Sequence, residues 1–281
     1  MMLVTAPAAA GAVPPAGAPP MPRTPAQHVM SLNLCTDQLL LDLVAPQRIA
    51  SLTFLARSPN DAVHWQAAMK IPVNHGYAEE VLAGKPDLVL SGTYTTAGTR
   101  ETLKQLGVPL VEVPPASNFE EIHAVTRQVA QALGESAAGE RLLSVMDSTL
   151  GELEEERSDR IITVAGWNGS GAVPGRGTLF DAILTAAGGI NIAASMRGTR
   201  SGSFDIEELL MAQPDVLAYG AGNRAPTLRD DSDQHPLILK LYGHRRVAYP
   251  EALYSCGIPE AAEAAVALRA TLLAAMNRRA P

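Results

Sequence analysis

The chain has no long hydrophobic run and no cluster of basic residues. No apolar stretch approaches the ~18–20 residues needed to cross a bilayer, so we expect no membrane-spanning helix and expect any membrane role to come through a partner. The 22 Lys and Arg residues are outnumbered by 29 Asp and Glu residues, and the net charge is −7. No basic block could follow a phosphate backbone, so the composition argues against nucleic-acid binding.

Aromatic residues are also scarce, at 4% of the chain, and there are only two cysteines. Hydrophobic residues make up 47% and charged residues 18%, which is typical of a soluble globular protein. At 281 residues the chain is long for a single core, so two domains of roughly 100 to 150 residues are expected. Two cysteines permit one disulfide but do not by themselves identify a cellular compartment.

Residues 1–27 differ in composition from the rest, being dominated by Ala, Pro and Gly with a single Arg. No packed structure is expected there. Leu3 to Ala12 resembles the apolar region and small-residue end of a secretory signal, although the basic region before it is missing. We interpret this segment as a truncated export signal followed by a Pro-rich linker; the alternative is a disordered tail on a cytoplasmic protein.

Residues 28–116 predict a first α/β lobe. Short apolar strands at "HVMSLNL" and "RIASLTF" flank a helix that begins near Thr36 and ends before Pro46. A helix over "YAEEVLAG" then leads into the buried run "LVL", and "VPLVEVPP" supplies a further strand. Strands that alternate with helices over short connections are typical of a parallel sheet.

Residues 117–158 predict the connection between two lobes. The pattern Ser117 with Glu120 is that of a capping box at a helix start. Apolar residues then recur three or four apart through the segment 137–157, namely Leu142, Leu143, Met146, Leu150 and Leu153. This spacing predicts one long amphipathic helix, about 30 Å from end to end at ~1.5 Å per residue, that acts as a rigid spine.

Residues 159–281 predict a second α/β lobe, in which strands and helices follow one another in the same order as in the first lobe. The stretch "DIEELLMAQPDVLAYG", residues 205–220, repeats "YAEEVLAGKPDLVLSG", residues 77–92, without a gap. Identical positions are Glu79/Glu207, Glu80/Glu208, Leu82/Leu210, Pro86/Pro214, Asp87/Asp215 and Gly92/Gly220. We interpret this as two copies of one architecture; the alternative is that Pro-Asp joints recur because Pro ends helices.

The order of these segments resembles one protein family. Two α/β lobes joined by a long helix, with "HVMSLNLCTDQLLLDLVAPQRIASLTFLARSP" first and "EEVLAGKPDLVLSG" later, are similar to the periplasmic substrate-binding proteins of ABC importers for vitamin B12, ferric siderophores and haem. The resemblance covers about residues 28 to 278. It implies a single chain that binds a metal chelate, either a corrinoid or a ferric siderophore, in the cleft between two lobes with parallel sheets. It also implies export to the periplasm, delivery to a permease dimer with its ATPase, and no catalysis.

The resemblance assigns permease docking to Glu79 and Glu207. In this family a surface glutamate on each lobe engages arginines of the permease. Two carboxylates on similar lobes would form a symmetric pair of anionic contacts for a dimeric partner. The alternative is that these side chains are solvated residues that favour a helix N-terminus.

We expect the ligand cleft at the loops that follow the strands, as in other open α/β sheets. These loops collect aromatic and arginine side chains in a chain that is poor in aromatic residues, namely Phe54, Tyr77, Tyr94, Trp167, Tyr254, Arg57, Arg176, Arg197 and Arg200. Aromatic faces stack on flat macrocycles, and guanidinium groups bind anionic chelates. Both kinds are present, so the sequence leaves the choice of chelate open.

Cys35 and Cys256 each follow a predicted strand, on loops that should face the cleft. Three interpretations remain open: two unrelated small residues of the cleft or of the packed interior, a disulfide that ties the lobes together, or one thiol that contacts the ligand. A disulfide requires Cα atoms within about 7 Å. We include both cysteines among the candidate ligand-binding residues.

Haem is the alternative ligand, because His75 and Tyr77 lie near the segment where haem-binding relatives place a tyrosine ligand. The six histidines are scattered and never at the spacing of metal ligands, so we predict no bare zinc or manganese site. A cytoplasmic α/β enzyme is the remaining alternative, since the Gly-rich string at 169–177 sits where a phosphate-binding loop would. That string matches no standard nucleotide motif.

Overall fold

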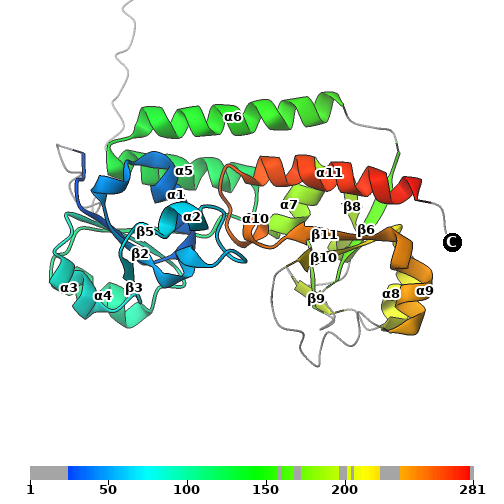
Figure 1. Ribbon diagram of the computed structural model, residues 1–281, viewed down its shortest axis with the longest axis horizontal. Helices are drawn as coiled ribbons and strands as arrows, with labels where there is room; N and C mark the ends of the chain where they lie inside the picture. Colours follow the sequence, from blue (N-terminus) through cyan, green and yellow to red (C-terminus); the bar gives the residue numbers. More distant parts are fainter. Residues whose placement is uncertain are drawn as a thin grey trace, which may run out of the picture.

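The computed structural model describes residues 25–156, 160–167, 172–195, 201–203, 206–221 and 235–278. Two α/β lobes lie side by side, and long helices run along one side of both (Figure 1). Within these ranges, no helix combines the length and the apolar character required to cross a membrane.

The N-terminal lobe is built on one five-stranded parallel sheet of order β3-β2-β1-β4-β5. Its strands are β1 (Val29–Ser31), β2 (Ile49–Thr53), β3 (Val73–Asn74), β4 (Leu88–Gly92) and β5 (Leu110–Val113). Its helices are α1 (Leu34–Leu43), α2 (Trp65–Ala68), α3 (Ala78–Gly84) and α4 (Ala97–Gln105), with short 3-10 turns η1 (Pro46–Arg48) and η2 (Phe54–Arg57).

The C-terminal lobe has a four-stranded parallel sheet of order β11-β10-β6-β8 and a small antiparallel pair, β7 with β9. Its strands are β6 (Ile162–Gly166), β7 (Ala172–Pro174), β8 (Gly189–Asn191), β9 (Ser201–Ser203), β10 (Val216–Ala221) and β11 (Arg246–Pro250). Its helices are α7 (Leu179–Ala186), α8 (Ile206–Ala212), α9 (Pro236–Tyr242), α10 (Ala252–Ser255) and α11 (Ala261–Asn277), with turns η3 (Ile192–Ser195) and η5 (Gly243–Arg245). The predicted fold class, two lobes with central parallel sheets, is confirmed.

The repeated stretch of the sequence forms the same joint in both lobes. Helices α3 and α8 occupy equivalent positions, and each is followed by a residue in the left-handed region, Lys85 with φ 47° and Gln213 with φ 45°. The Asp of each Pro-Asp pair then accepts hydrogen bonds from the chain at or before the neighbouring strand. Asp87 accepts from the backbone N–H groups of Gln27 and His28, and Asp215 from the backbone N–H and hydroxyl of Thr163.

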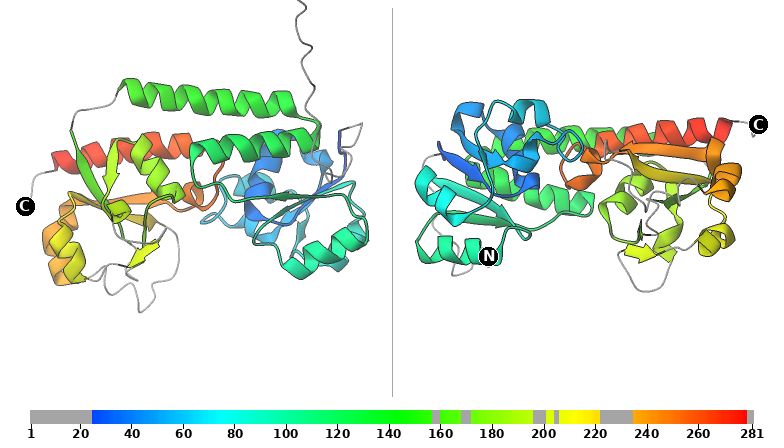
Figure 2. Two further views of the ribbon diagram at one scale, coloured as in Figure 1. Left: turned by 180° about the vertical axis from the view of Figure 1, so that it is seen from behind. Right: turned by 60° about the horizontal axis from the view of Figure 1, so that its bottom comes forward.

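Two helices connect the lobes, α5 (Phe119–Leu133) and α6 (Ser136–Glu155). Helix α6 runs along both lobes, with α5 and α11 beneath it (Figures 1 and 2). Leu142 packs against the core of the N-terminal lobe, whereas Leu143, Met146 and Leu153 belong to the core of the C-terminal lobe. The amphipathic pattern therefore predicts the spine helix correctly, within two residues at either end.

The helix starts differ from the predicted ones by a few residues. Asn33, not Thr36, caps α1, because its side chain accepts a hydrogen bond from the Cys35 N–H. Asn118, not Ser117, caps α5 by accepting from the Glu121 N–H, and the Glu121 carboxylate accepts from the Ser117 N–H. Several Ser, Thr, Asn and Asp residues stand together at each start, and all of these types can cap a helix.

The chain makes a second crossing between the lobes just before α11. Cys256 and Ile258 are buried in the core of the N-terminal lobe, while α11 packs in the core of the C-terminal lobe. Gly257 passes so close to Ala116 that a Cβ atom would overlap its backbone. The side chains on either side of this crossing therefore hold the two lobes to each other.

Candidate functional site

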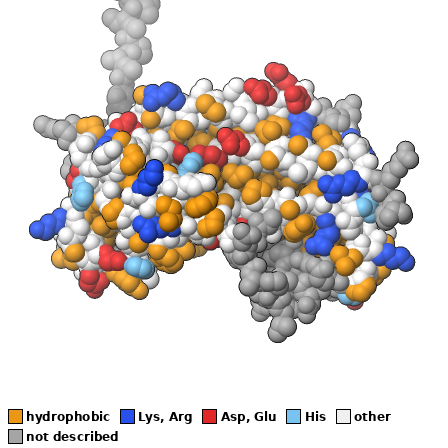
Figure 3. Space-filling view, viewed as in Figure 1, with side chains coloured by type: hydrophobic (Ala, Val, Ile, Leu, Met, Phe, Trp, Pro, Cys, Tyr) orange, Lys and Arg blue, Asp and Glu red, His pale blue; other side chains and the backbone are white. Residues whose placement is uncertain are grey.

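The carboxyl ends of the strands in both sheets turn toward the junction between the lobes. In the N-terminal lobe, β1 leads to Cys35 and β5 leads to Ala116, and in the C-terminal lobe β11 leads to Cys256. In Figure 3 the outline turns inward between the lobes on the side away from α6. This is the position at which parallel α/β sheets bind ligands.

Cys35 and Cys256 form a disulfide, with Cα atoms 5.1 Å apart. The pairing settles the three interpretations that the sequence left open. Both sulfurs are engaged in the bond, so neither cysteine offers a thiol to a ligand, and Cys256 is only 2% exposed. The bond ties α1 of the N-terminal lobe to the segment that leads into α11.

A small pocket lies beside the disulfide at the carboxyl ends of β1, β4 and β5. Its lining includes Asn33, Cys35, Tyr94, Ala116 and Gly257, and its volume is ≈ 30 Å³. Sites for drug-sized ligands are usually about 300–1,000 Å³. This pocket is therefore too small to enclose a chelate.

Three rings form an exposed row on the N-terminal lobe, just beyond the carboxyl ends of β2 and β3. The ring centroids of Phe54 and His75 are 5.4 Å apart, and those of His75 and Tyr77 are 6.4 Å apart, with interplanar angles near 25°. Phe54 is 51% exposed and Tyr77 is 61% exposed. This aromatic row, Phe54–His75–Tyr77, presents a nearly continuous apolar face to solvent.

Glu80 fixes the middle of the aromatic row. Its carboxylate accepts hydrogen bonds from the backbone N–H groups of His75 and Tyr77, at 2.8 and 3.1 Å, and lies 3.0 Å from His75 Nδ1. The slight burial of Glu80 acts to raise its pKa, but these hydrogen bonds outweigh the burial and lower the pKa. An ionised Glu80 favours the proton on Nδ1, which turns the Nε2 lone pair outward.

Two other predicted ligand-binding residues of the N-terminal lobe, Tyr94 and Arg57, differ in their exposure to solvent. Tyr94, on the loop after β4, is 85% exposed and lines the small pocket, so its ring is available to a ligand. Arg57 is half-buried, and its guanidinium donates a hydrogen bond to the carbonyl of Ile71 at 2.7 Å. Arg57 therefore supports the loop before β3 in this structure.

Trp167 is buried in the C-terminal lobe, and Tyr254 is half-buried there. Trp167 is 3% exposed among Leu209, Ile238 and Tyr242, because its backbone still bonds to β10 and its side chain points into the core. Tyr254 packs at 4.4 Å from Tyr249 between ring centroids, and burial raises its pKa well above the ordinary range. The expectation that Trp167 faces the cleft is corrected, since its ring packs in the core of its own lobe, whereas Tyr254 remains partly exposed.

The arginines of the C-terminal lobe are only partly described. Arg176 is exposed, and its Nε donates a hydrogen bond to the carbonyl of Ala194 at 3.0 Å. Arg197 and Arg200 lie outside the described residues. The described candidates for ligand contact therefore come mainly from the N-terminal lobe.

The two glutamates expected to dock on a permease are both exposed. Glu79 lies in the first turn of α3 and Glu207 in the first turn of α8. Both helices lie on the side of the molecule away from α6 (Figures 1 and 2). The carboxylate of the neighbouring Glu80 is hydrogen-bonded to His75 in the aromatic row. Glu79 is therefore the more available of the two α3 carboxylates for contact with a partner.

The Gly-rich string at 169–177 lies partly outside the described residues. Its described part forms β7 and then leads into α7, whose first turn is capped from within the chain. Thr178 accepts a hydrogen bond from the Asp181 N–H, and the Asp181 carboxylate accepts from the Gly177 N–H at 3.0 Å. The carboxylate puts negative charge where a phosphate would bind, which opposes the nucleotide-binding alternative.

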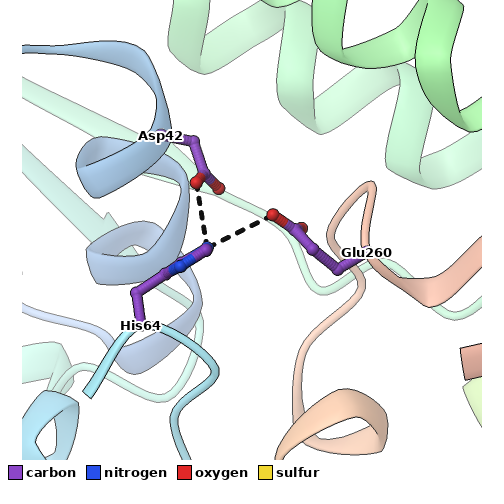
Figure 4. A group of neighbouring side chains, drawn as sticks. All are labelled: Asp42, His64 and Glu260. Atoms are coloured by element: carbon purple, nitrogen blue, oxygen red, sulfur yellow. Dashed lines mark hydrogen bonds and ion pairs between the residues drawn. The ribbon is translucent and has the colours of Figure 1, made fainter. Parts of the chain in front are cut away.

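A cluster of three titratable groups joins the two lobes (Figure 4). His64 Nε2 lies 2.9 Å from Asp42 Oδ1 and 3.2 Å from Glu260 Oε1. The three ligand-type atoms all lie within 4.8 Å of one another. The sequence analysis missed this cluster because its members come from three distant segments, and no short spacing signals their approach.

Comparison with known proteins points to one family. A family model described as "Periplasmic binding protein" matches residues 29–237. No curated protein matches the chain.

Several solved structures share the fold. The haem-binding protein RhuT from Roseiflexus sp. RS-1 has a TM-score of 0.76 at 22% identity, over 89% of this chain and 99% of that one. The vitamin B12-binding protein BtuF of Vibrio cholerae has a TM-score of 0.69 at 16% identity, over 90% and 99%. A protein of an Fe³⁺-hydroxamate transport system from Saccharomonospora viridis has a TM-score of 0.68 at 17% identity, over 88% and 93%.

Proposed function

Because the chain belongs to the periplasmic binding protein family, we propose that it captures a metal chelate between its two lobes and presents it to an ABC permease with its ATPase. The chelate is a corrinoid or a ferric siderophore. The protein itself performs no catalysis, and transport is driven by the ATPase. The similar structures named for vitamin B12, haem and Fe³⁺-hydroxamate proteins support a chelate as the class of ligand.

The aromatic row Phe54–His75–Tyr77 is the single observation that carries this proposal. Two of its rings are more than half exposed in a chain whose aromatic content is only 4%. Exposing such rings to water is unfavourable, and covering them with a flat apolar surface recovers stacking energy. A chelate ring lying on this row would contact it without needing an enclosed pocket.

The disulfide supports export. Disulfides persist in oxidising compartments such as the bacterial periplasm and are rare in the cytosol. The Cys35–Cys256 bond is therefore consistent with a periplasmic protein, and it opposes the cytoplasmic enzyme as an alternative. Glu79 and Glu207 complete the proposal as the two anionic contacts for the halves of the permease.

The proposal is tested by titrating the purified protein separately with cyanocobalamin, a ferric hydroxamate siderophore and haemin. Visible absorption and tryptophan fluorescence report binding. We expect saturable binding of one of the first two chelates at one molecule per chain. Phe54→Ala and Tyr77→Ala should each weaken this binding about fivefold, since stacking on an aromatic ring contributes ~1 kcal/mol.

Leu106→Ala provides the matched control, because Leu106 is 57% exposed on the same lobe but lies outside the aromatic row. Its affinity for the chelate should equal that of the unmodified protein. Absence of binding by all three chelates would refute the proposal. Binding that is insensitive to both aromatic substitutions would refute the role of the row.

Haem is the second candidate, favoured by the geometry of His75. Its Nδ1 lies 3.0 Å from the Glu80 carboxylate, which is the arrangement that holds a ligating histidine in the tautomer with Nε2 free. Haemin binding with a shifted Soret band that is lost in His75→Ala but kept in Tyr77→Phe would select this candidate. Loss in Tyr77→Phe instead would assign the axial position to the tyrosine.

A further inference from the structure

His64, Asp42 and Glu260 form a cluster whose members come from both sides of the junction. Asp42 lies in the last turn of α1, His64 directly precedes α2, and Glu260 directly precedes α11. The side chains of Asp42, His64 and Glu260 are 12%, 25% and 16% exposed. They are therefore largely removed from water but still reachable by a small ion.

A single hydrogen atom, on Nε2 of His64, is available to two carboxylates in this cluster. The imidazole Nε2 faces both Asp42 Oδ1 and Glu260 Oε1, yet an Nε2 atom carries at most one hydrogen. The second oxygens, Asp42 Oδ2 and Glu260 Oε2, are buried and have no hydrogen-bond partner among the described residues. Buried carboxylate oxygens without a partner are costly, so the hydrogen-bonded form leaves the cluster incompletely satisfied.

The charges are also unbalanced. The imidazole carries at most one positive charge, and it lies between two acids. Asp42 also sits at the C-terminal end of α1, where negative charge is unfavourable. One charge of +1 cannot neutralise both carboxylates, whereas a divalent cation bound to a neutral imidazole would do so.

The distances fit a small transition-metal ion. A tetrahedral zinc ion with bonds of ~2.0–2.1 Å holds its ligand atoms roughly 3.3–3.4 Å apart. Two of the separations in the cluster are 2.9 and 3.2 Å, and all are within 4.8 Å, so a small shift of the carboxylates would complete three ligands. Water can supply the fourth, because the cluster is partly open.

A polar side chain holds the histidine in place. The backbone N–H of His64 donates to Gln38 Oε1 at 2.8 Å, and Gln38 is 1% exposed within α1. Gln38 and Asp42 lie one turn apart on the same helix, so one rigid element positions both the histidine and one carboxylate. Support of this kind orients the ligands of a metal site.

We propose that Asp42, His64 and Glu260 bind one divalent transition-metal ion, with zinc as the best-fitting representative, and that the ion clamps α1 and α2 of the N-terminal lobe to the start of α11. Nitrogen and carboxylate ligands suit zinc, and Mn²⁺ and Fe²⁺, at the weak end of the series of divalent metals, should bind such a site more weakly. The clamp lies beside the disulfide, four residues along the chain from Cys256 in the same crossing segment. The site is distinct from the aromatic row and does not depend on the proposed chelate.

The test is a titration of the full chain, stripped of metal with EDTA and dialysed, with zinc chloride alone. A chromophoric zinc chelator that competes with the protein reports the affinity. We expect one zinc ion per chain and an increase in the melting temperature on binding. Asp42→Asn and Glu260→Gln keep the side-chain shapes and should each lower the affinity at least about tenfold. His64→Ala should abolish the site.

A histidine variant serves as the matched control. His123 lies 2.8 Å from Asp147 in a two-residue pair. His123→Ala should leave zinc affinity and stoichiometry unchanged. The proposal is overturned if the unmodified protein binds no stoichiometric zinc. It is also overturned if folded Asp42→Asn and Glu260→Gln, checked by circular dichroism, bind zinc as the unmodified protein does.

Discussion

Asp37 is a fully buried carboxyl group in the first turn of α1, close to the candidate cleft. It accepts hydrogen bonds from the backbone N–H and the hydroxyl of Thr53, at the end of β2. Burial nevertheless raises its pKa to about 7, because these hydrogen bonds only partly replace the lost hydration. The folded protein therefore favours the protonated form of Asp37 because of its burial.

Asp37→Asn should remove a pH dependence of stability. Between the ordinary pKa of 3.8 and the raised value of about 7, the folded protein binds more protons than the unfolded chain. The stabilisation that protonated Asp37 contributes to the folded protein is therefore fully present at low pH, and it is lost as the pH rises through this window. Across the whole window, this contribution to the free energy of unfolding changes by on the order of 4 kcal/mol.

The measurement is chemical denaturation of both proteins from pH 4 to pH 8. The free energy of unfolding of the unmodified protein should fall relative to that of Asp37→Asn as pH increases. A difference between the two proteins that stays constant over this range would contradict the account of Asp37.

At the residue scale, the sequence predicted which loops meet but not which way each side chain points. Phe54, Tyr77 and Tyr94, which were predicted to contact the ligand, lie exposed near strand ends. Trp167 follows a strand in the same way, but one more hydrogen bond to β10 turns its ring into the core. Orientation of this kind depends on where a strand ends to within one residue, which sequence patterns do not resolve.

At the scale of elements, the joint between helix and strand is the best-predicted feature. The aligned stretches form α3 with β4 and α8 with β10 at equivalent positions. The sequence did not predict that Lys85 and Gln213 would both adopt the left-handed conformation, because neither is the Gly that usually marks it. The backbone conformation of this residue is constrained by the end of the helix before it and by the Pro after it. The residue adopts the same conformation in both lobes.

Lys85→Gly and Gln213→Gly should each stabilise the protein. A residue with a Cβ atom in the left-handed region is strained by about 1 kcal/mol, which glycine avoids at some cost in chain entropy. The free energy of unfolding should therefore rise by up to ~1 kcal/mol in each variant. Denaturation in urea measures this, with Lys85→Ala as the control that keeps the Cβ atom and should show no gain. A loss of stability in both glycine variants would refute strain at these joints.

At the scale of the whole molecule, the two lobes are connected by the helices α5 and α6 and by the crossing at residues 256–258. The sequence predicted the first connection, since a long amphipathic pattern without strand signals is distinctive. It left the second open, because two cysteines permit a disulfide without requiring one. Only the folded chain brings Cys35 and Cys256 to 5.1 Å between Cα atoms.

Removal of the disulfide should destabilise the protein and loosen the contact between the lobes. Cys35→Ala/Cys256→Ala should lower the free energy of unfolding by ~2–5 kcal/mol, because the bond closes a loop with a sequence separation of 221 residues. Hydrogen exchange should increase most at residues 256–260 and at the start of α1. An unchanged stability together with unchanged exchange in these segments would contradict the role assigned to the crossing.

The most direct test of the account is uptake of the chelate into proteoliposomes that contain the ABC permease and its ATPase. Chelate-loaded protein should support ATP-dependent uptake. Glu79→Lys/Glu207→Lys should bind the chelate normally but reduce uptake at least about tenfold, since each reversal places like charges at the contact. Glu120→Lys, an exposed change on α5, should have no effect. Uptake that proceeds without the protein, or that is unaffected by the double reversal, would contradict the account.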